Sequence, residues 1–212
     1  MKANDVYEAI RAKKIITIIR GVEESVIVKI AEALIAGGIE MMEVTCNTAG
    51  FASMIRALKE ATKGKMLIGA GTVISVDLAK EALAAGAEYA IAPDTNADVI
   101  SYCVENDVAV MPGAATPTEV LTARRYGAKM VKIFPASALG ADYIRQLCGP
   151  IDDVEFVAVG GVTPANVRDF MKAGCIGIGI GSAVAKKAHI AAGNWAGITA
   201  AAKELVAAVN GD

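Results

Sequence analysis

A lysine inside an apolar segment is the first residue of this sequence that could do chemistry. Lys132 lies within "KMVKIF", residues 129–134, whose hydrophobic neighbours favour a buried strand. Lysine is rarely buried without a partner, and loss of water lowers the pKa of its amine. An unperturbed lysine is neutral in only about one molecule in a thousand near pH 7. A buried Lys132 is therefore a candidate nucleophile that could attack a ketone and form a Schiff base.

Glu43 is the residue best placed to exchange protons with Lys132. Several segments share one pattern, in which a helical stretch ends at a glycine and a strand follows directly. Five residues beyond Gly38 is Glu43, and five residues beyond Gly127 is Lys132. If the two turns are equivalent, both side chains face the interior of a closed barrel at the same height. Such a carboxylate could act as general acid and base, but the spacing is equally compatible with a plain buried Lys–Glu ion pair.

Two glycine-rich segments in the last third of the chain could bind an anion. "AVGGVTP", residues 158–164, follows one candidate strand, and "GIGIGSAV", residues 177–184, ends another and precedes a helix. Glycines leave backbone N–H groups accessible, and barrels commonly bind phosphate between the last two loops of this kind. We therefore predict phosphate ligands at Gly160, Gly161 and Ser182.

Other polar residues and prolines stand at the ends of candidate strands. Arg20 could hold a carboxylate or a phosphate, and Thr72 could hold a substrate carboxylate, although both are also ordinary residues for a strand end or a turn. Pro93 ends the fourth candidate strand. Further along, "TPTE" predicts a helix with Thr116 as its N-cap and Pro117 in its first position.

The order of segments along the chain predicts a (β/α)8 barrel, or TIM barrel, as a single domain over residues 1–212. Eight short apolar runs alternate with alanine-rich helical stretches. The candidate strands are 15–20, 39–45, 66–70, 88–92, 108–112, 129–134, 155–159 and 175–180. An open, doubly wound sheet fits less well, because no GxGxxG turn follows the first strand.

The composition excludes several classes of function. A formal net charge of -2 gives no support to nucleic-acid binding or to an anionic membrane surface. The mean hydropathy is +0.45, but no apolar run approaches the roughly 18 residues of a membrane span, and no signal-peptide core is present. The four cysteines form no CxxC pair, and the single histidine, His189, excludes a multi-histidine metal site. We expect a soluble, cytoplasmic protein without nucleic-acid or membrane partners.

A set of ordered motifs resembles the 2-keto-3-deoxy-6-phosphogluconate (KDPG) aldolase family. The motifs are "EVT" at 43–45, "GAGTV" at 69–73, "PGAATPTE" at 112–119, "KIFPAS" at 132–137 and "GGV…GIGS" from 160 to 182. The resemblance implies a (β/α)8 barrel, usually a homotrimer, that catalyses class I aldol cleavage without a metal or cofactor. The implied substrate is a 2-keto-3-deoxy-6-phospho sugar acid, cleaved to pyruvate and glyceraldehyde 3-phosphate, with 4-hydroxy-2-oxoglutarate as a possible side substrate.

The resemblance also implies roles for individual residues. Lys132 resembles the Schiff-base lysine, and Glu43 resembles the acid/base that acts through the carbinolamine water. The residues that resemble the substrate pocket are Arg20, Thr72, Pro93 and Phe134, and those that resemble the phosphate site are Gly160, Gly161, Gly181 and Ser182.

Two positions bear on which sugar acid is cleaved. Val159 stands where phosphogluconate-type members often have a threonine, and Asn47 stands where many carry an arginine. Both residues look more like the related 2-keto-3-deoxy-6-phosphogalactonate (KDPGal) aldolases, whereas "TPTE" and "EVT" look like the gluconate type. One hydroxyl contact changes the discrimination between epimers by only ~1–3 kcal/mol, so both epimers stay open.

Two other interpretations use the same residues. A different phosphate-binding barrel enzyme, an isomerase or synthase, would use Lys132 as a charge rather than as a nucleophile. An inactive barrel that serves as an assembly scaffold would retain the motifs without turnover. The joint presence of Glu43, Lys132 and both glycine loops favours the aldolase.

Overall fold

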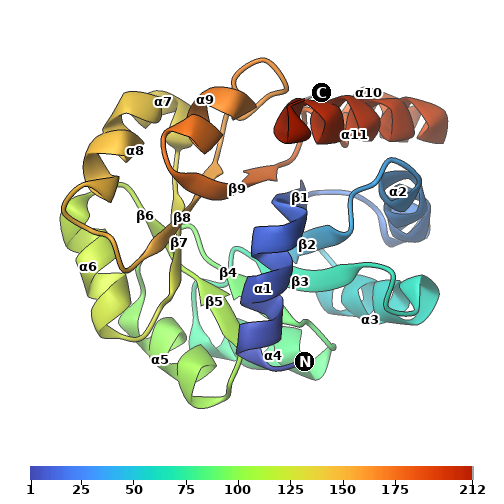
Figure 1. The fold of residues 1–212 in the computed structure, drawn as a ribbon. Helices are drawn as coiled ribbons and strands as arrows, with labels where there is room; N and C mark the ends of the chain where they lie inside the picture. Colours follow the sequence, from blue (N-terminus) through green and yellow to red (C-terminus); the bar gives the residue numbers. More distant parts are fainter. Residues whose placement is uncertain (212) are drawn as a thin grey trace.

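The strands form a closed ring surrounded by helices in this computed structural model, which describes residues 1–211 (Figure 1). The strands are β1 (Ile15–Ile19), β2 (Met41–Thr45), β3 (Leu67–Gly71), β4 (Tyr89–Ile91), β5 (Ala109–Met111), β6 (Gly113–Ala114), β7 (Met130–Ile133), β8 (Glu155–Val159) and β9 (Cys175–Ile180). They pair in the order β5-β4-β3-β2-β1-β9-β8-β7-β6, and the pairs are parallel. The two ends of this order, β5 and β6, are separated along the chain by Pro112 alone. The predicted (β/α)8 barrel is therefore confirmed.

The fifth strand differs from the prediction of one run over residues 108–112. It consists of β5, which pairs with β4, and β6, which pairs with β7. Pro112 has no N–H to donate and interrupts the ladder. Its carbonyl still accepts a hydrogen bond of 2.9 Å from the N–H of Lys132. The chain thus changes neighbours at the height of Lys132, and this change closes the barrel.

The helices form the outer layer, with α1 as the exception. They are α1 (Ala3–Lys13), α2 (Glu24–Ala36), α3 (Phe51–Thr62), α4 (Val76–Ala84), α5 (Ala97–Glu105), α6 (Pro117–Arg125), α7 (Ala136–Leu139), α8 (Ala141–Cys148), α9 (Val167–Lys172), α10 (Lys187–Ala191) and α11 (Trp195–Asn210). None of the helices within residues 1–211 has the length and apolar character needed to cross a membrane.

The helix boundaries follow the predicted signals. Four glycines each stand between a helix and the strand that follows it, and all have φ between +88° and +110°, which glycine adopts at little cost: Gly38, Gly86, Gly127 and Gly174. Thr116 is the N-cap of α6: its hydroxyl accepts a hydrogen bond from the N–H of Glu119, and the Glu119 carboxylate accepts one from the N–H of Thr116. This reciprocal pair is a capping box, and Pro117 follows in the first turn as predicted.

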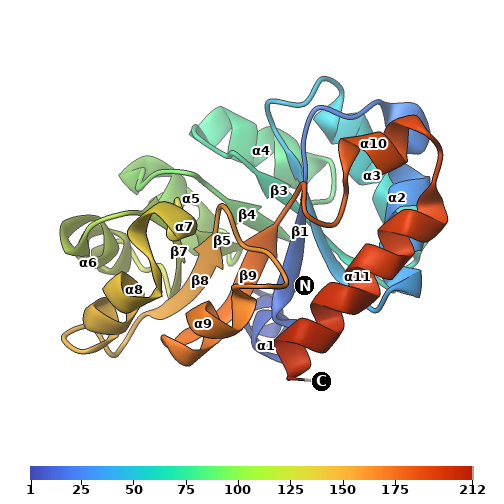
Figure 2. The ribbon, with the colours of Figure 1, turned by 90° about the horizontal axis from the view of Figure 1, so that it is seen from above.

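Helix α1 covers the amino-terminal end of the barrel, as Figures 1 and 2 show from two directions. Val6, Tyr7 and Ile10 are buried and pack with the inward-facing side chains of the strands. The Tyr7 hydroxyl donates to the carbonyl of Val110 at 3.3 Å and accepts from its N–H at 3.1 Å. These contacts close the barrel at the end opposite the carboxyl ends of the strands.

Side-chain alternation along two strands places the charged residues inside the barrel. On β7, Met130 belongs to the inner cluster, so Lys132, two residues on, faces the same way. On β2, Met41 is in the inner cluster and Glu43 follows it in the same register. The intervening residues Met42, Val44, Val131 and Ile133 pack outward against the helix layer.

Candidate active site

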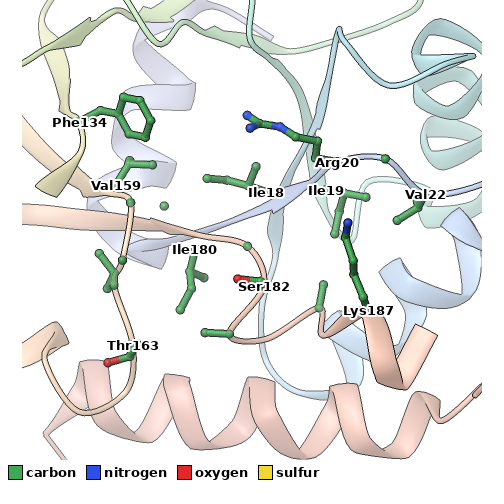
Figure 3. Close-up of a pocket in the computed structure, with 18 of the residues that line it drawn as sticks. Ile18, Ile19, Arg20, Val22, Phe134, Val159, Thr163, Ile180, Ser182 and Lys187 are labelled. Carbon is green, nitrogen blue, oxygen red and sulfur yellow. The ribbon is translucent and has the colours of Figure 1, made fainter. Parts of the chain in front are cut away.

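A pocket of about 510 Å³ opens at the carboxyl ends of β1, β7, β8 and β9 (Figure 3). This is the end of a parallel barrel at which catalytic residues are expected. The predicted residues that line it are Arg20, Lys132, Phe134, Val159, Gly160, Gly161, Gly181 and Ser182. Residues from widely separated parts of the sequence therefore meet in one cavity.

Lys132 lies at the inner end of this pocket with 4% of its surface exposed. Burial lowers the pKa of its amine, the Glu43 carboxylate opposes that change, and the positive charge of Arg20 lowers the pKa further. The Nζ atom lies 4.8 Å from the centroid of the Phe134 ring. Burial thus favours the neutral amine, which is the nucleophilic form.

Glu43 is 1% exposed. Burial raises the pKa of its carboxyl to about 7, although the positive charges of Lys132 and Arg20 oppose the rise. Its Oε2 atom is buried and has no hydrogen-bond partner. A Cβ on Gly71 would lie 2.2 Å from Oε1, so only glycine leaves room for the carboxylate in this position.

Lys132 and Glu43 form no ion pair with each other or with any other residue within 1–211. A structural ion pair buried in a core needs close contact, because Coulomb attraction must offset the loss of hydration. Here the two groups face one interior and influence each other's pKa without contact. This arrangement does not fit the plain buried ion pair that the spacing alone allowed. It leaves both groups able to act on a molecule between them.

Arg20 and the residue after it form hydrogen bonds with residues that follow β3 and β2. Its Nη2 atom donates to Thr72 Oγ1 at 3.3 Å. Thr72 has a φ of +56°, which is unfavourable for a β-branched residue. Strained backbone conformations of this kind are frequent at functional sites. The next residue, Gly21, donates its N–H at 3.0 Å to the hydroxyl of Thr48, which is 3% exposed. Thr48 therefore fixes the loop that carries Arg20.

The two glycine loops present backbone donors to the pocket. Within residues 1–211, the N–H groups of Gly160, Gly161, Gly181 and Ser182 donate to no backbone carbonyl or side chain. Gly160 and Gly161 have φ of +94° and +72°. A Cβ on Gly161 would lie 2.0 Å from the hydroxyl oxygen of Ser137, so a larger residue does not fit. Unpaired N–H groups gathered in this way are suited to bind an anion.

Comparison with known proteins decides the family. The model of the family "KDPG and KHG aldolase" matches residues 6–201. The chain belongs to this aldolase family. The 2-dehydro-3-deoxy-phosphogluconate aldolase of Treponema pallidum is 33% identical over 202 residues, 95% of this chain and 96% of the relative. The 2-dehydro-3-deoxy-6-phosphogalactonate aldolase of Escherichia coli K12 is 37% identical over 169 residues, 79% of this chain and 82% of the relative.

A similar solved structure contains a covalent intermediate. The KDPG aldolase from Legionella pneumophila, with pyruvate captured at low pH as a covalent carbinolamine intermediate, superimposes with a TM-score of 0.87. It is 29% identical, and the match covers 92% of this chain and 95% of that chain. The family of this aldolase therefore includes a member in which pyruvate is bound covalently.

Four predicted site residues do not line the pocket. Glu43 lies beneath it in the barrel interior, and Thr72 reaches it through Arg20. Pro93 is half-buried at the end of β4, where its carbonyl would lie 2.3 Å from a Cβ on Gly113. Asn47 is exposed beyond the end of β2. Direct contacts of Pro93 and Asn47 with a substrate therefore stay predictions.

The structure also adds residues that the sequence patterns did not indicate. Ile18, Thr163 and Lys187 line the pocket, and Thr48 supports it from behind. Ile18 was detectable in principle, because it stands two residues before Arg20 on the same strand. No sequence pattern indicated that Lys187 lines the pocket, since it lies in a polar stretch beyond the last glycine motif.

Proposed function

We propose that this protein is a class I aldolase that cleaves a 2-keto-3-deoxy-6-phospho sugar acid to pyruvate and glyceraldehyde 3-phosphate. The observation that carries the proposal is that Lys132 and Glu43 are both buried in the barrel interior and form no ion pair with each other. The names of the two curated relatives and the carbinolamine in the Legionella pneumophila enzyme support it. The free N–H groups of the glycine loops suit a substrate phosphate.

The chemistry begins with the neutral amine of Lys132, which adds to the C2 ketone. The C2 oxygen takes up the proton that the nitrogen loses, which gives a carbinolamine; a second proton, supplied by the Glu43 carboxyl, then lets this oxygen leave as water, and an iminium forms. Glu43, acting through this water, then takes the proton of the C4 hydroxyl as the C3–C4 bond breaks. The electron pair of that bond passes to C3 and is held as an enamine, while the aldehyde fragment departs. C3 then accepts a proton, and water hydrolyses the iminium to release pyruvate and the amine.

The charges and pKa values of the site suit proton transfer and substrate binding. A proton carrier works best when its pKa lies near the working pH, and burial brings the pKa of Glu43 to about 7. We assign the substrate carboxylate to Arg20, whose guanidinium donates a hydrogen bond to Thr72. We assign the phosphate end of the substrate to Gly160, Gly161, Gly181 and Ser182.

Borohydride trapping tests the nucleophile. Incubation with pyruvate and sodium borohydride should add one reduced pyruvyl group to Lys132, located by peptide mass spectrometry. Lys132→Met should abolish the addition. Lys129→Gln is the matched control, because Lys129 lies in the same segment but its ammonium lies 5.8 Å from the Tyr7 ring, at the other end of the barrel. Labelling of Lys132→Met at the wild-type level would overturn the mechanism.

The choice of sugar acid depends on Val159. This residue is 4% exposed and lines the pocket beside the glycine loop. An apolar side chain offers no hydrogen bond to the C4 hydroxyl, which favours the galactonate epimer over the gluconate epimer. Comparison of kcat/KM on the two epimers tests this preference, and a strong preference for gluconate would contradict it. Cleavage of 4-hydroxy-2-oxoglutarate requires only the pyruvate half of the pocket and is proposed as a side activity.

We also propose that the protein assembles as a homotrimer. Support comes from the family resemblance and from exposed apolar side chains, since Ile74, Val104 and Tyr126 are 49%, 42% and 45% exposed. A Cβ on Gly127 would lie 3.2 Å from Val104, so Val104 lies close to the chain segment that carries Tyr126. Light scattering coupled to gel filtration measures the mass of the assembly, and a monomer at micromolar concentration would contradict the proposal.

A further inference from the structure

Lys187 is a cation of the pocket that forms no hydrogen bond or ion pair within residues 1–211. It lies at the start of α10, is exposed, and lines the same cavity as Lys132 and the glycine loops. In Figure 3 its side chain extends from α10 towards Ile19 and Val22, at the end of β1. A flexible lysine with no partner is free to move towards a bound anion.

The other two cations of the pocket, Arg20 and Lys132, are directed towards or lie beside Phe134. Lys132 is buried beneath Phe134, and Arg20 donates to Thr72. In Figure 3 Arg20 turns towards Phe134 and away from Lys187. The charges of Arg20 and Lys132 therefore act on the keto-acid end of a substrate, whereas the glycine loops provide only neutral N–H donors. A phosphate dianion bound there would lack a full positive charge unless Lys187 supplied one.

We infer that Lys187 is the charged ligand of the substrate phosphate and sets the preference for phosphorylated over unphosphorylated keto acids. This inference rests on the proposed aldolase function. Ser182 and Lys187 are five residues apart, at the end of β9 and the start of α10, and both line the cavity. The loop between them therefore brings N–H donors and an ammonium to one side of the pocket. Hydrogen bonds from charged donors to phosphate are about twice as strong as neutral ones.

Direct binding tests the inference without turnover. Glycerol 3-phosphate carries the phosphate and three carbons of the aldehyde product but cannot react with Lys132. Calorimetry should show its Kd about ten-fold higher for Lys187→Gln than for the wild type, as expected for one charged contact near solvent. Lys186→Gln is the matched control, since Lys186 is the adjacent exposed lysine and does not line the pocket. Equal Kd values for Lys187→Gln and Lys186→Gln would overturn the inference.

Kinetics separate this role from a structural one. For Lys187→Gln, KM for the phosphorylated substrate should rise with little change in kcat. The ratio of kcat/KM for that substrate to kcat/KM for 4-hydroxy-2-oxoglutarate should fall about ten-fold. Lys187→Arg should restore most of the ratio, because it retains the charge. An unchanged ratio would refute only the role of Lys187 and not the aldolase function. Absence of cleavage by the wild type would refute the proposed function, and the binding experiment would still test Lys187.

Discussion

Replacement of Glu43 by glutamine should stabilise the fold in a pH-dependent way. The carboxyl of Glu43 has a pKa of about 7 in the folded protein, compared with an ordinary value of 4.5. The folded protein therefore retains this proton up to about pH 7, whereas the unfolded chain releases it from about pH 4.5. Rising pH then favours the unfolded chain, so the cost of Glu43 is absent below pH 4.5 and complete above pH 7.

The size of the effect follows from the shift. A change from 4.5 to about 7 is about 2.5 pKa units, and each unit corresponds to 1.36 kcal/mol. The full cost is therefore about 3 kcal/mol above pH 7, of which under 1 kcal/mol is already present at pH 5. The amide of Glu43→Gln does not titrate. The advantage of this variant over the wild type should grow by about 2–3 kcal/mol between pH 5 and pH 8.

Urea unfolding at pH 5 and pH 8, at one protein concentration, measures this difference. Comparison across pH removes any constant effect of the amide on packing. Glu105→Gln is the control, because it removes a carboxylate from the exposed end of α5 and should leave the difference near zero. If the advantage of Glu43→Gln is the same at both pH values, the carboxyl is not held protonated by burial and the reasoning fails.

Two further predictions concern the same carboxylate. The kcat/KM profile of the wild type should rise with pH in two steps, one near pH 7 rather than 4.5 and one below the ordinary lysine value of 10.5, because the carboxylate and the neutral amine are the active forms. Both steps belong to the coupled Lys132–Glu43 pair, and full activity already at pH 5 would contradict this. Gly71→Ala places a Cβ 2.2 Å from Glu43 Oε1, so it should reduce the free energy of unfolding by about 1–3 kcal/mol and kcat by up to about 100-fold. Gly149→Ala is the control, because the nearest atom to its added Cβ would be 3.7 Å away. Urea unfolding and turnover are measured for both variants, and equal effects would argue against displacement of Glu43.

The parts of the structure that depend on local patterns were predictable. Helix-ending glycines and alternating apolar segments located eight strand positions, because left-handed φ values and side-chain alternation are local properties. The equal offsets of Glu43 and Lys132 from their glycines placed both in the barrel interior for the same reason. The break at Pro112 was not predicted, since an apolar run gives no sign that its two halves pair with different neighbours.

Residues that reach the site through tertiary contacts could not be predicted from the sequence. Thr48 supports the Arg20 loop through a hydrogen bond to Gly21, 27 residues away in sequence. Lys187 reaches the pocket because the chain between β9 and α10 folds back over the end of β1. Neither residue lies in a periodic pattern or a motif. Conversely, Asn47 follows a motif residue closely, but the turn after β2 leaves it exposed.

The closure of the amino-terminal end by α1 has a consequence for the order of events. The barrel interior is blocked behind Lys132, so reactants and products exchange through the opening at the carboxyl ends of the strands. In the proposed mechanism, pyruvate attached to Lys132 occupies the inner position, and the phosphorylated aldehyde lies between it and solvent. The aldehyde must therefore leave first, and in the direction of synthesis pyruvate must enter first. In the proposed mechanism, α1 thus adds to the covalent attachment of pyruvate in setting an ordered release of products, although it touches none of the reacting groups.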